Sequence, residues 1–181
     1  MKIENIDLND ISFLEILKKY LTESQPYEGF DVGMSKFYLK KRVKEFVDSD
    51  LNECDIATSF ISGDGDALFF LFCKKDEVNK KLEIIFPFPN LNVLDYNSWS
   101  TWPFSFCHLM LDQLNRSGFD GAYGEIQRRN KEENYEKALL RFGHKMFEVK
   151  PIEGKRYKKV IISKDNLEKA HTKLKRIYKK G

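Results

Sequence analysis

One stretch, residues 121–147, constrains the fold more than any other part of the sequence. It begins with a short run bounded by glycine and asparagine, which predicts a β-strand that ends at a turn near Asn130. Apolar residues then recur at three- and four-residue spacing, which predicts an amphipathic helix; they are Tyr135, Ala138, Leu139 and Phe142. Gly143 is suited to end that helix, because glycine readily adopts the left-handed conformation of a helix C-terminus. The stretch therefore predicts a strand, a turn, a helix and the start of a second strand.

The remaining sequence predicts strands and helices on both sides of this stretch. In chain order they are a strand at 2–7, helices at 10–24 and 35–47, strands at 55–62, 67–74 and 81–88, a helix at 103–118, the strand and helix just described, strands at 145–150 and 157–163, and a helix at 166–179. The strand at 67–74 is rich in phenylalanine, so we expect it to be buried on both faces at the centre of a sheet. Pro87 and Pro89 lack backbone donors, so we expect them to end the pairing of the strand at 81–88.

The composition is typical of a single folded domain. The chain has 181 residues, of which 41% are hydrophobic, and this is enough for one full core. No apolar run reaches the roughly 20 residues of a membrane-spanning helix, and the N-terminus lacks the apolar centre of a signal peptide. The cysteines, Cys54, Cys73 and Cys107, stand in apolar surroundings, which favours buried thiols in a reducing compartment over disulfides or a metal site. We therefore expect a cytoplasmic protein without a metal.

The strand, the Asn130 turn, the helix and the strand after Gly143 resemble the C-terminal signature of the GNAT acyltransferase family. The predicted element order extends the resemblance over about residues 1–163, with one helix added at the C-terminus. The resemblance implies an α+β, three-layer fold with a mixed central sheet flanked by helices. The whole chain, 1–181, is then one GNAT-like domain, with a core at 1–163 and a basic C-terminal helix at 164–180.

The resemblance implies N-acyl transfer from acetyl-CoA, or another acyl-CoA, to an amine. Family members hold the CoA pyrophosphate in a basic, Gly-rich turn, because glycine lets backbone N–H groups approach phosphate. The corresponding segment here, residues 89–106, contains no glycine, lysine or arginine. Helix N–H groups and hydroxyls near Ser100 could replace that turn, or the cofactor groove is lost. The residues that we expect to contact the cofactor are Phe86, Ser100, Thr101, Trp102 and Asn130.

Two residues are candidates for proton transfer by analogy with the family. Glu83 lies on a mostly apolar strand, where a carboxylate can act as a base on the amine, directly or through water; otherwise it faces solvent by strand alternation. Tyr135 lies one turn before the position at which the family often has a tyrosine acid, where the chain has Leu139. Tyr135 is therefore either the acid or a packing residue.

Candidates for binding the amine acceptor come from a loop and a strand. The loop at 25–33 mixes aromatic and acidic side chains that could hold a cation, and it is otherwise a packed connector. Glu125 lies on the strand at the start of the stretch, and its alternative role is a cross-strand ion pair. The predicted substrate-binding residues are Tyr27, Glu28, Phe30 and Glu125.

Two alternatives to a CoA-dependent enzyme remain open. One is a GNAT-like binding or assembly module that has lost catalysis. The other is an acyltransferase fed by an acyl-carrier protein, which the basic C-terminal helix could attract as an acidic partner. No base-reading motif accompanies the formal charge of +3, so nucleic acid is not expected as a partner. A homodimer is left open.

Overall fold

The computed structural model describes residues 2–23, 36–65, 67–89, 101–127, 148–151, 153 and 157–178. Seven strands form one sheet in the order β1-β2-β3-β4-β5-β7-β6. They are β1 (Lys2–Asn5), β2 (Ile56–Ile61), β3 (Ala67–Asp76), β4 (Lys81–Pro89), β5 (Gly121–Gln127), β6 (Glu148–Pro151) and β7 (Tyr157–Ser163). The helices are α1 (Ile11–Glu23), α2 (Lys36–Asp48), the short 3-10 helix η1 (Asp50–Glu53), α3 (Thr101–Ser117) and α5 (Lys164–Tyr178). The helix that the sequence predicts between β5 and β6 lies outside the described residues.

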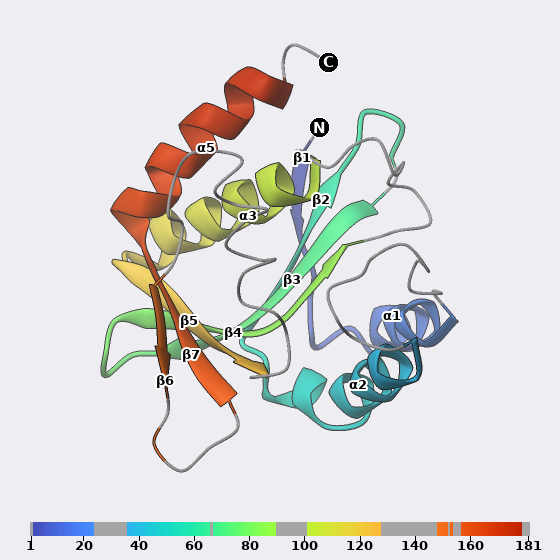
Figure 1. Cartoon of the computed structure of the whole chain (residues 1–181). Helices are drawn as coiled ribbons and strands as arrows, with labels where there is room; N and C mark the ends of the chain where they lie inside the picture. Colours follow the sequence, from blue (N-terminus) through green and yellow to red (C-terminus); the bar gives the residue numbers. More distant parts are fainter. Residues whose placement is uncertain are drawn as a thin grey trace.

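The sheet is mixed, and helices cover both faces (Figure 1). Among the described strand pairs only β4 and β5 run parallel, joined by α3, and the others are antiparallel. One buried cluster packs α3 and α5 against the sheet and includes Leu82, Ala122 and Ile162. A second cluster packs α1 and α2 against the other face through Phe46 and Phe72. This arrangement confirms the predicted three-layer architecture.

β3 lies inside the sheet, as its sequence predicts. Its side chains alternate between the two clusters, with Leu71 on the α3 side and Phe70 and Phe72 on the α2 side. All three are buried. Burial on both faces of the sheet therefore explains why the sequence of β3 is rich in phenylalanine.

Local signals in the sequence also determine several element ends. The backbone N–H of Phe13 donates to Asp10 Oδ1 at 3.2 Å, so Asp10 caps α1 as expected. α3 begins at Thr101, and Pro103 lies in its first turn, as expected, because no backbone donor is needed there. Gly118 ends α3 with a positive φ of 71°.

The prediction that Pro87 and Pro89 end the pairing of β4 is wrong. Pro87 lies opposite Leu71 and Pro89 lies opposite Phe69, so the ladder with β3 continues to the end of the strand. A proline fits an antiparallel ladder only where its nitrogen points away from the partner. The bonds to β3 must therefore come from Phe86 and Phe88, and the nitrogens of both prolines face the β5 side.

The three cysteines are buried thiols, as predicted. Burial raises the pKa of the Cys54 thiol to about 12 and that of the Cys107 thiol to about 12. Burial also raises the pKa of Cys73. These thiols therefore belong to the core, because a protonated, enclosed thiol is a poor nucleophile.

Candidate active site at the β4–β5 junction

The parallel strands β4 and β5 pair over only part of their length. Lys81–Ile84 of β4 lies opposite Gly121–Gly124 of β5, and the register ends there. β4 then continues along β3 to Pro89, whereas β5 continues along β7 to Gln127. Figure 1 shows the two arrows pointing apart. We call the opening between them the β4–β5 splay.

A β-bulge lies where β4 leaves β5. Phe72 of β3 is opposite Phe86, but the next residue, Cys73, is opposite Ile84, so Ile85 is the extra residue. A bulge bends its strand and increases the local twist, which helps to turn β4 away from β5. The sequence could not predict it, because a bulge depends on the register with a partner strand.

Glu83 lies immediately before this bulge. The neighbouring Leu82 is buried in the α3–α5 cluster, so strand alternation directs Glu83 to the face that carries α1 and α2. Glu83 is half-buried. Its exposure is therefore between that of a desolvated base and that of a solvent-facing residue, the two alternatives that the sequence left open. Lys74 is opposite it on β3, but the Lys74 Nζ atom is 3.7 Å from Glu53 Oε2. Among the described residues, Glu83 has no hydrogen bond or ion pair.

Tyr123 is the neighbour of Glu83 on β5. Its hydroxyl donates to Asp76 Oδ2 at 3.1 Å, and the Lys159 Nζ atom is 4.1 Å from the centre of its ring. Burial raises the pKa of Tyr123 to about 12, helped by the hydrogen bond to Asp76 and the negative charge of Glu83. Hydrogen bonds from Asn79 hold the pKa of Asp76 below its usual range. Tyr123 is therefore a neutral phenol beside the carboxylates of Asp76 and Glu83. The sequence did not predict this group, because its three residues lie on three different strands.

Glu125 lies on the same face as Tyr123, one residue beyond the last position at which β5 pairs with β4. It is exposed and opposite Lys159, the partner expected for a cross-strand ion pair. The ammonium group of Lys159 instead lies over the Tyr123 ring. Within the described part of the chain, Glu125 forms no ion pair, so its carboxylate is available at the rim of the splay.

The structure describes fewer contacts for the other predicted site residues. The Phe86 ring stacks on Phe46 of α2, with centroids 4.6 Å apart, so its side chain packs against the α1–α2 cluster. Thr101 and Trp102 open α3. The side chains of these two residues lie outside the described part, and so do six further predicted residues: Tyr27, Glu28, Phe30, Ser100, Asn130 and Tyr135. The roles of all eight stay predictions.

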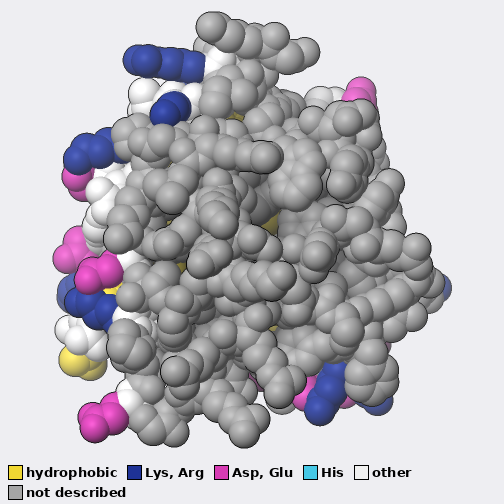
Figure 2. All heavy atoms as spheres, viewed as in Figure 1, with side chains coloured by type: hydrophobic (Ala, Val, Ile, Leu, Met, Phe, Trp, Pro, Cys, Tyr) yellow, Lys and Arg dark blue, Asp and Glu magenta, His cyan; other side chains and the backbone are white. Residues whose placement is uncertain are grey.

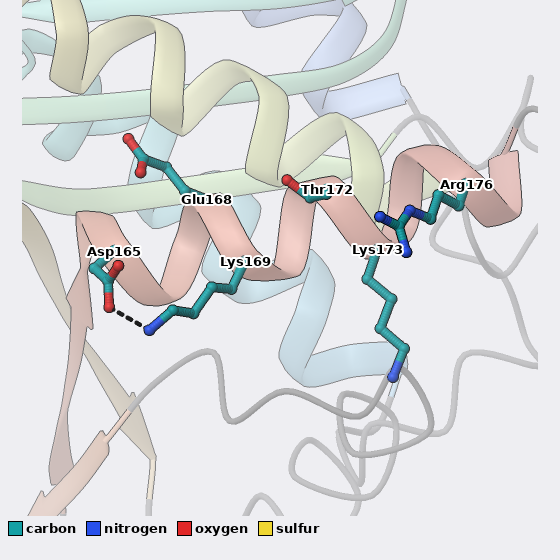
Figure 3. A pocket seen from close by; sticks show the side chains of 6 residues that line it. All are labelled: Asp165, Glu168, Lys169, Thr172, Lys173 and Arg176. Atoms are coloured by element: carbon teal, nitrogen blue, oxygen red, sulfur yellow. Dashed lines mark hydrogen bonds and ion pairs between the residues drawn. The ribbon is translucent and has the colours of Figure 1, made fainter.

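A hollow of about 520 Å³ runs along α5, away from this site. Figure 3 shows the six α5 side chains that line it: Asp165, Glu168, Lys169, Thr172, Lys173 and Arg176. Asp165 and Lys169 form an ion pair at 2.6 Å. Side chains of both signs also show along the left edge of Figure 2, where α5 and the β3–β4 turn lie in Figure 1. The six side chains are of mixed charge, and α5 covers the sheet face opposite to Glu83.

His108 of α3 and His171 of α5 form a second group of titratable residues. The Nδ1 atom of His108 is 3.1 Å from the Nε2 atom of His171, and Phe104 lies against both rings. Burial lowers the pKa of His108 and lowers that of His171 to about 4. The two histidines are 63 residues apart in the sequence, so no local pattern predicts their contact.

Two kinds of feature are absent from the described residues. No group of three or more His, Cys, Asp or Glu side chains there is arranged to hold a metal ion. No helix in that part of the chain has the length and apolar character needed to cross a bilayer.

Comparison with known proteins identifies the fold. No protein-family model matches the sequence, and no curated protein matches it. Solved structures do match over nearly the whole chain. A chimera of the spermidine N-acetyltransferase SpeG from Vibrio cholerae and hSSAT has a TM-score of 0.53 at 9% identity, over 93% of this chain and 99% of its own.

Two further structures agree with this match. Aminoglycoside 6'-acetyltransferase type Ii has a TM-score of 0.52 at 16% identity, over 91% of this chain and 97% of its own. Mutant forms of the spermidine/spermine N-acetyltransferase SpeG from Vibrio cholerae have a TM-score of 0.53 at 8% identity, over 93% and 97%. Together with the parallel β4–β5 pair and its splay, these matches show that the chain has the GNAT acetyltransferase fold.

Proposed function

We propose that the protein transfers an acetyl or longer acyl group from a CoA thioester to an amine. The observation that carries this proposal is the position of Glu83 beside the β4–β5 splay, half-buried and without a cationic partner among the described residues. A carboxylate in such a place can accept a proton from an ammonium group. The similar structures include enzymes whose names give spermidine and aminoglycosides as acceptors, both of which carry amines.

In the proposed reaction Glu83 takes one proton from the bound ammonium group, directly or through a water molecule. The amine lone pair then attacks the acyl carbonyl, a C–N bond forms, and the C–S bond breaks with the sulfur leaving as the CoA thiol or thiolate. Glu125, at the rim of the splay, is suited to hold a second positive charge of the acceptor. Tyr27, Glu28 and Phe30 remain proposed acceptor contacts, and Tyr135 remains the proposed acid for the leaving sulfur.

The residues around the splay fit an acyl-CoA in part. The opening itself and the bulge at Ile85 expose β4 backbone to a ligand, and the N-terminus of α3, which follows β4 in the chain, is a kind of site that attracts phosphate groups. In the proposal, the residues that lie along the cofactor are Phe86, Ser100, Thr101, Trp102 and Asn130. The chain therefore binds and orients the thioester, and the thioester supplies the activated acyl group.

One observation favours a second candidate, a GNAT-like binding module or an acyltransferase fed by a carrier protein. Pro87 and Pro89 face the splay and have no N–H group, so this end of β4 cannot donate to a ligand. Residues 89–106 also lack the glycine and basic residues that commonly cradle a pyrophosphate. Both features weaken recognition of the CoA part without affecting Glu83.

Calorimetry with acetyl-CoA and with free CoA distinguishes the candidates, with thermal melting as a second readout. A ligand at 100 times its Kd should stabilise the fold by about 2.7 kcal/mol. The Glu83→Gln variant should bind as well as the wild type but lose roughly 100-fold or more in kcat with an amine acceptor. Glu77→Gln, a surface change in the β3–β4 turn, is the matched control and should keep full activity.

No heat and no melting shift at millimolar CoA would rule out the CoA-dependent enzyme. Acyl-loaded carrier protein is then the next donor to test. Turnover that survives in Glu83→Gln would remove Glu83 as the base while leaving the acyltransferase proposal in place. Polyamines and aminoglycosides are the first acceptors to screen.

A further inference from the structure

The side chain of Tyr123 crosses the neighbouring strand β4. Its Cα lies on β5, but its hydroxyl bonds Asp76 at the end of β3. Adjacent strands are about 4.8 Å apart, so β3 and β5 are separated by about 10 Å with β4 between them. The ring must therefore lie over β4.

The register locates the crossing between two residues of β4. Tyr123 is opposite Glu83, whereas Asp76 is opposite Lys81. All four side chains lie on the same face of the sheet by strand alternation. The ring therefore passes between the side chains of Lys81 and Glu83.

Contacts at both ends hold the ring in this position. Asp76 accepts a hydrogen bond from the Asn79 backbone at 3.0 Å and another from its side-chain amide at 2.7 Å. The Lys159 ammonium group lies over the ring at 4.1 Å from its centre. The backbone of β5 is fixed as well, because Gly121 lies directly against the Ile162 carbonyl.

This arrangement affects the charge next to Glu83. Lys81 and Glu83 are two residues apart on one strand face, a spacing that permits an ion pair between long side chains. The described part of the chain contains no such pair, and the Tyr123 ring occupies the space between them. In the described part of the chain, Lys74 and Lys159 are further cations on this face of the sheet. Lys74 pairs with Glu53, and Lys159 lies over the Tyr123 ring.

We propose that Tyr123 is a positioning residue for Glu83, separating its carboxylate from Lys81 and leaving it free to turn toward the bulge and the splay. This inference rests on the proposed function of Glu83 as the base. An ion pair with Lys81 would occupy the carboxylate and stabilise its ionised form, which makes it a weaker base. The ring thus keeps the carboxylate free for the ammonium group of the acceptor.

The first test needs no substrate and measures the contact itself. In protein labelled with ¹³C at the tyrosine Cζ, the Tyr123 signal is identified by its absence in Tyr123→Phe. At pH 10.5 an ordinary tyrosine, with a pKa near 10, is mostly ionised, whereas Tyr123 should remain mostly neutral. Glu83→Gln should raise its ionised fraction, and Glu77→Gln should not. An unchanged Tyr123 signal in Glu83→Gln means that the two groups are not adjacent, which overturns the proposal.

The second test uses turnover and a rescue variant. Tyr123→Leu keeps apolar volume on β5 but is too short to cross β4, so Lys81 can reach Glu83. We expect kcat to fall about 10-fold, with the KM for acyl-CoA unchanged. Tyr123→Phe, which keeps the ring, should lose less. Adding Lys81→Gln to Tyr123→Leu should restore most of kcat.

A fall in kcat that Lys81→Gln does not restore means that Tyr123 is only structural, and an unchanged kcat in Tyr123→Leu also overturns the proposal. Melting temperatures of all variants separate loss of fold from loss of positioning. If the wild type neither binds CoA nor transfers acyl groups, the proposed function fails. The tyrosine titration then still decides whether Glu83 and Tyr123 touch.

Discussion

At the scale of single residues, the close approach of β5 to β7 requires a residue without a side chain at position 121. A Cβ atom on Gly121 would lie 2.5 Å from the Ile162 carbonyl oxygen, closer than real Cβ contacts come. Glycine is therefore needed where β5 meets β7. The sequence shows this glycine but not the reason for it, because Ile162 is far away in the chain.

Gly121→Ala should destabilise the fold by roughly 1–3 kcal/mol, since β5 or β7 must move to admit the methyl group. Urea denaturation measures the change. Gly63→Ala in the β2–β3 turn, where a Cβ meets nothing within 4 Å, is the matched control. Equal stability of the two variants would contradict the close approach of β5 and β7.

At the scale of secondary-structure elements, α3 and α5 are joined by the His108–His171 hydrogen bond as well as by apolar packing. One imidazole donates its N–H and the other accepts, so the bond is lost when both rings are protonated. Asp112 and Lys175 are the charged groups that affect these rings: Asp112 raises the pKa of His108, and Lys175 lowers both. Burial nevertheless dominates, and both pKa values lie below their usual range.

Stability should therefore fall on acidification. The pKa of His171 is about 4 in the folded protein, against 6.5 for an ordinary histidine such as one in the unfolded chain, so between these values the unfolded chain binds more protons. The free energy of unfolding should decrease as the pH falls through 6.5 and level off below about 4. Because His171 is only half-buried, we expect a loss of about 1–2 kcal/mol rather than the full value of the shift.

Urea denaturation at pH 7.5 and pH 5 measures this loss. His171→Phe should reduce the pH dependence, because position 171 then has no imidazole to protonate, while the phenyl ring still packs on Phe104. Thr172→Ala, a change at the next residue that does not titrate, should keep the wild-type dependence. A His171→Phe variant with the full acid sensitivity would assign that sensitivity to other groups.

At the scale of the whole molecule, α5 belongs to the main core. The sequence predicts it as a basic helix added to a core that ends at residue 163. In the structure its apolar face is nevertheless fully enclosed with α3 and the sheet, through Leu167, Ala170 and Leu174. We therefore expect α5 to unfold together with the sheet.

Leu167→Ala should lower the free energy of unfolding by about 2–5 kcal/mol. It should shift the whole transition, as monitored both by helix circular dichroism and by aromatic absorption. Glu168→Ala, an exposed neighbour on the same helix, should change stability by less than about 0.5 kcal/mol. A separate early transition confined to helix signal would show that α5 is an independent unit.

The sequence by itself determined the order of the described elements and the central place of β3, and it limited the cap of α1 to Asn9 or Asp10. These features depend on the spacing of apolar residues and on neighbours three positions apart, which can be read locally. The apolar face of α5 could also be read from the sequence, because Leu167 and Leu174 are seven residues, or two helical turns, apart. Glu83 was found as a candidate by analogy with the GNAT family, because it is an acid on the strand that corresponds to the family's fourth strand.

Only the tertiary structure decided the features that make the site. The bulge at Ile85, the splay after Ile84 and the tolerance of Pro87 depend on which strand lies on each side of β4. The Tyr123–Asp76 bond and the His108–His171 bond join residues 47 and 63 positions apart. Strand register and helix packing create these contacts, and both are set by burial of the whole core rather than by any local pattern.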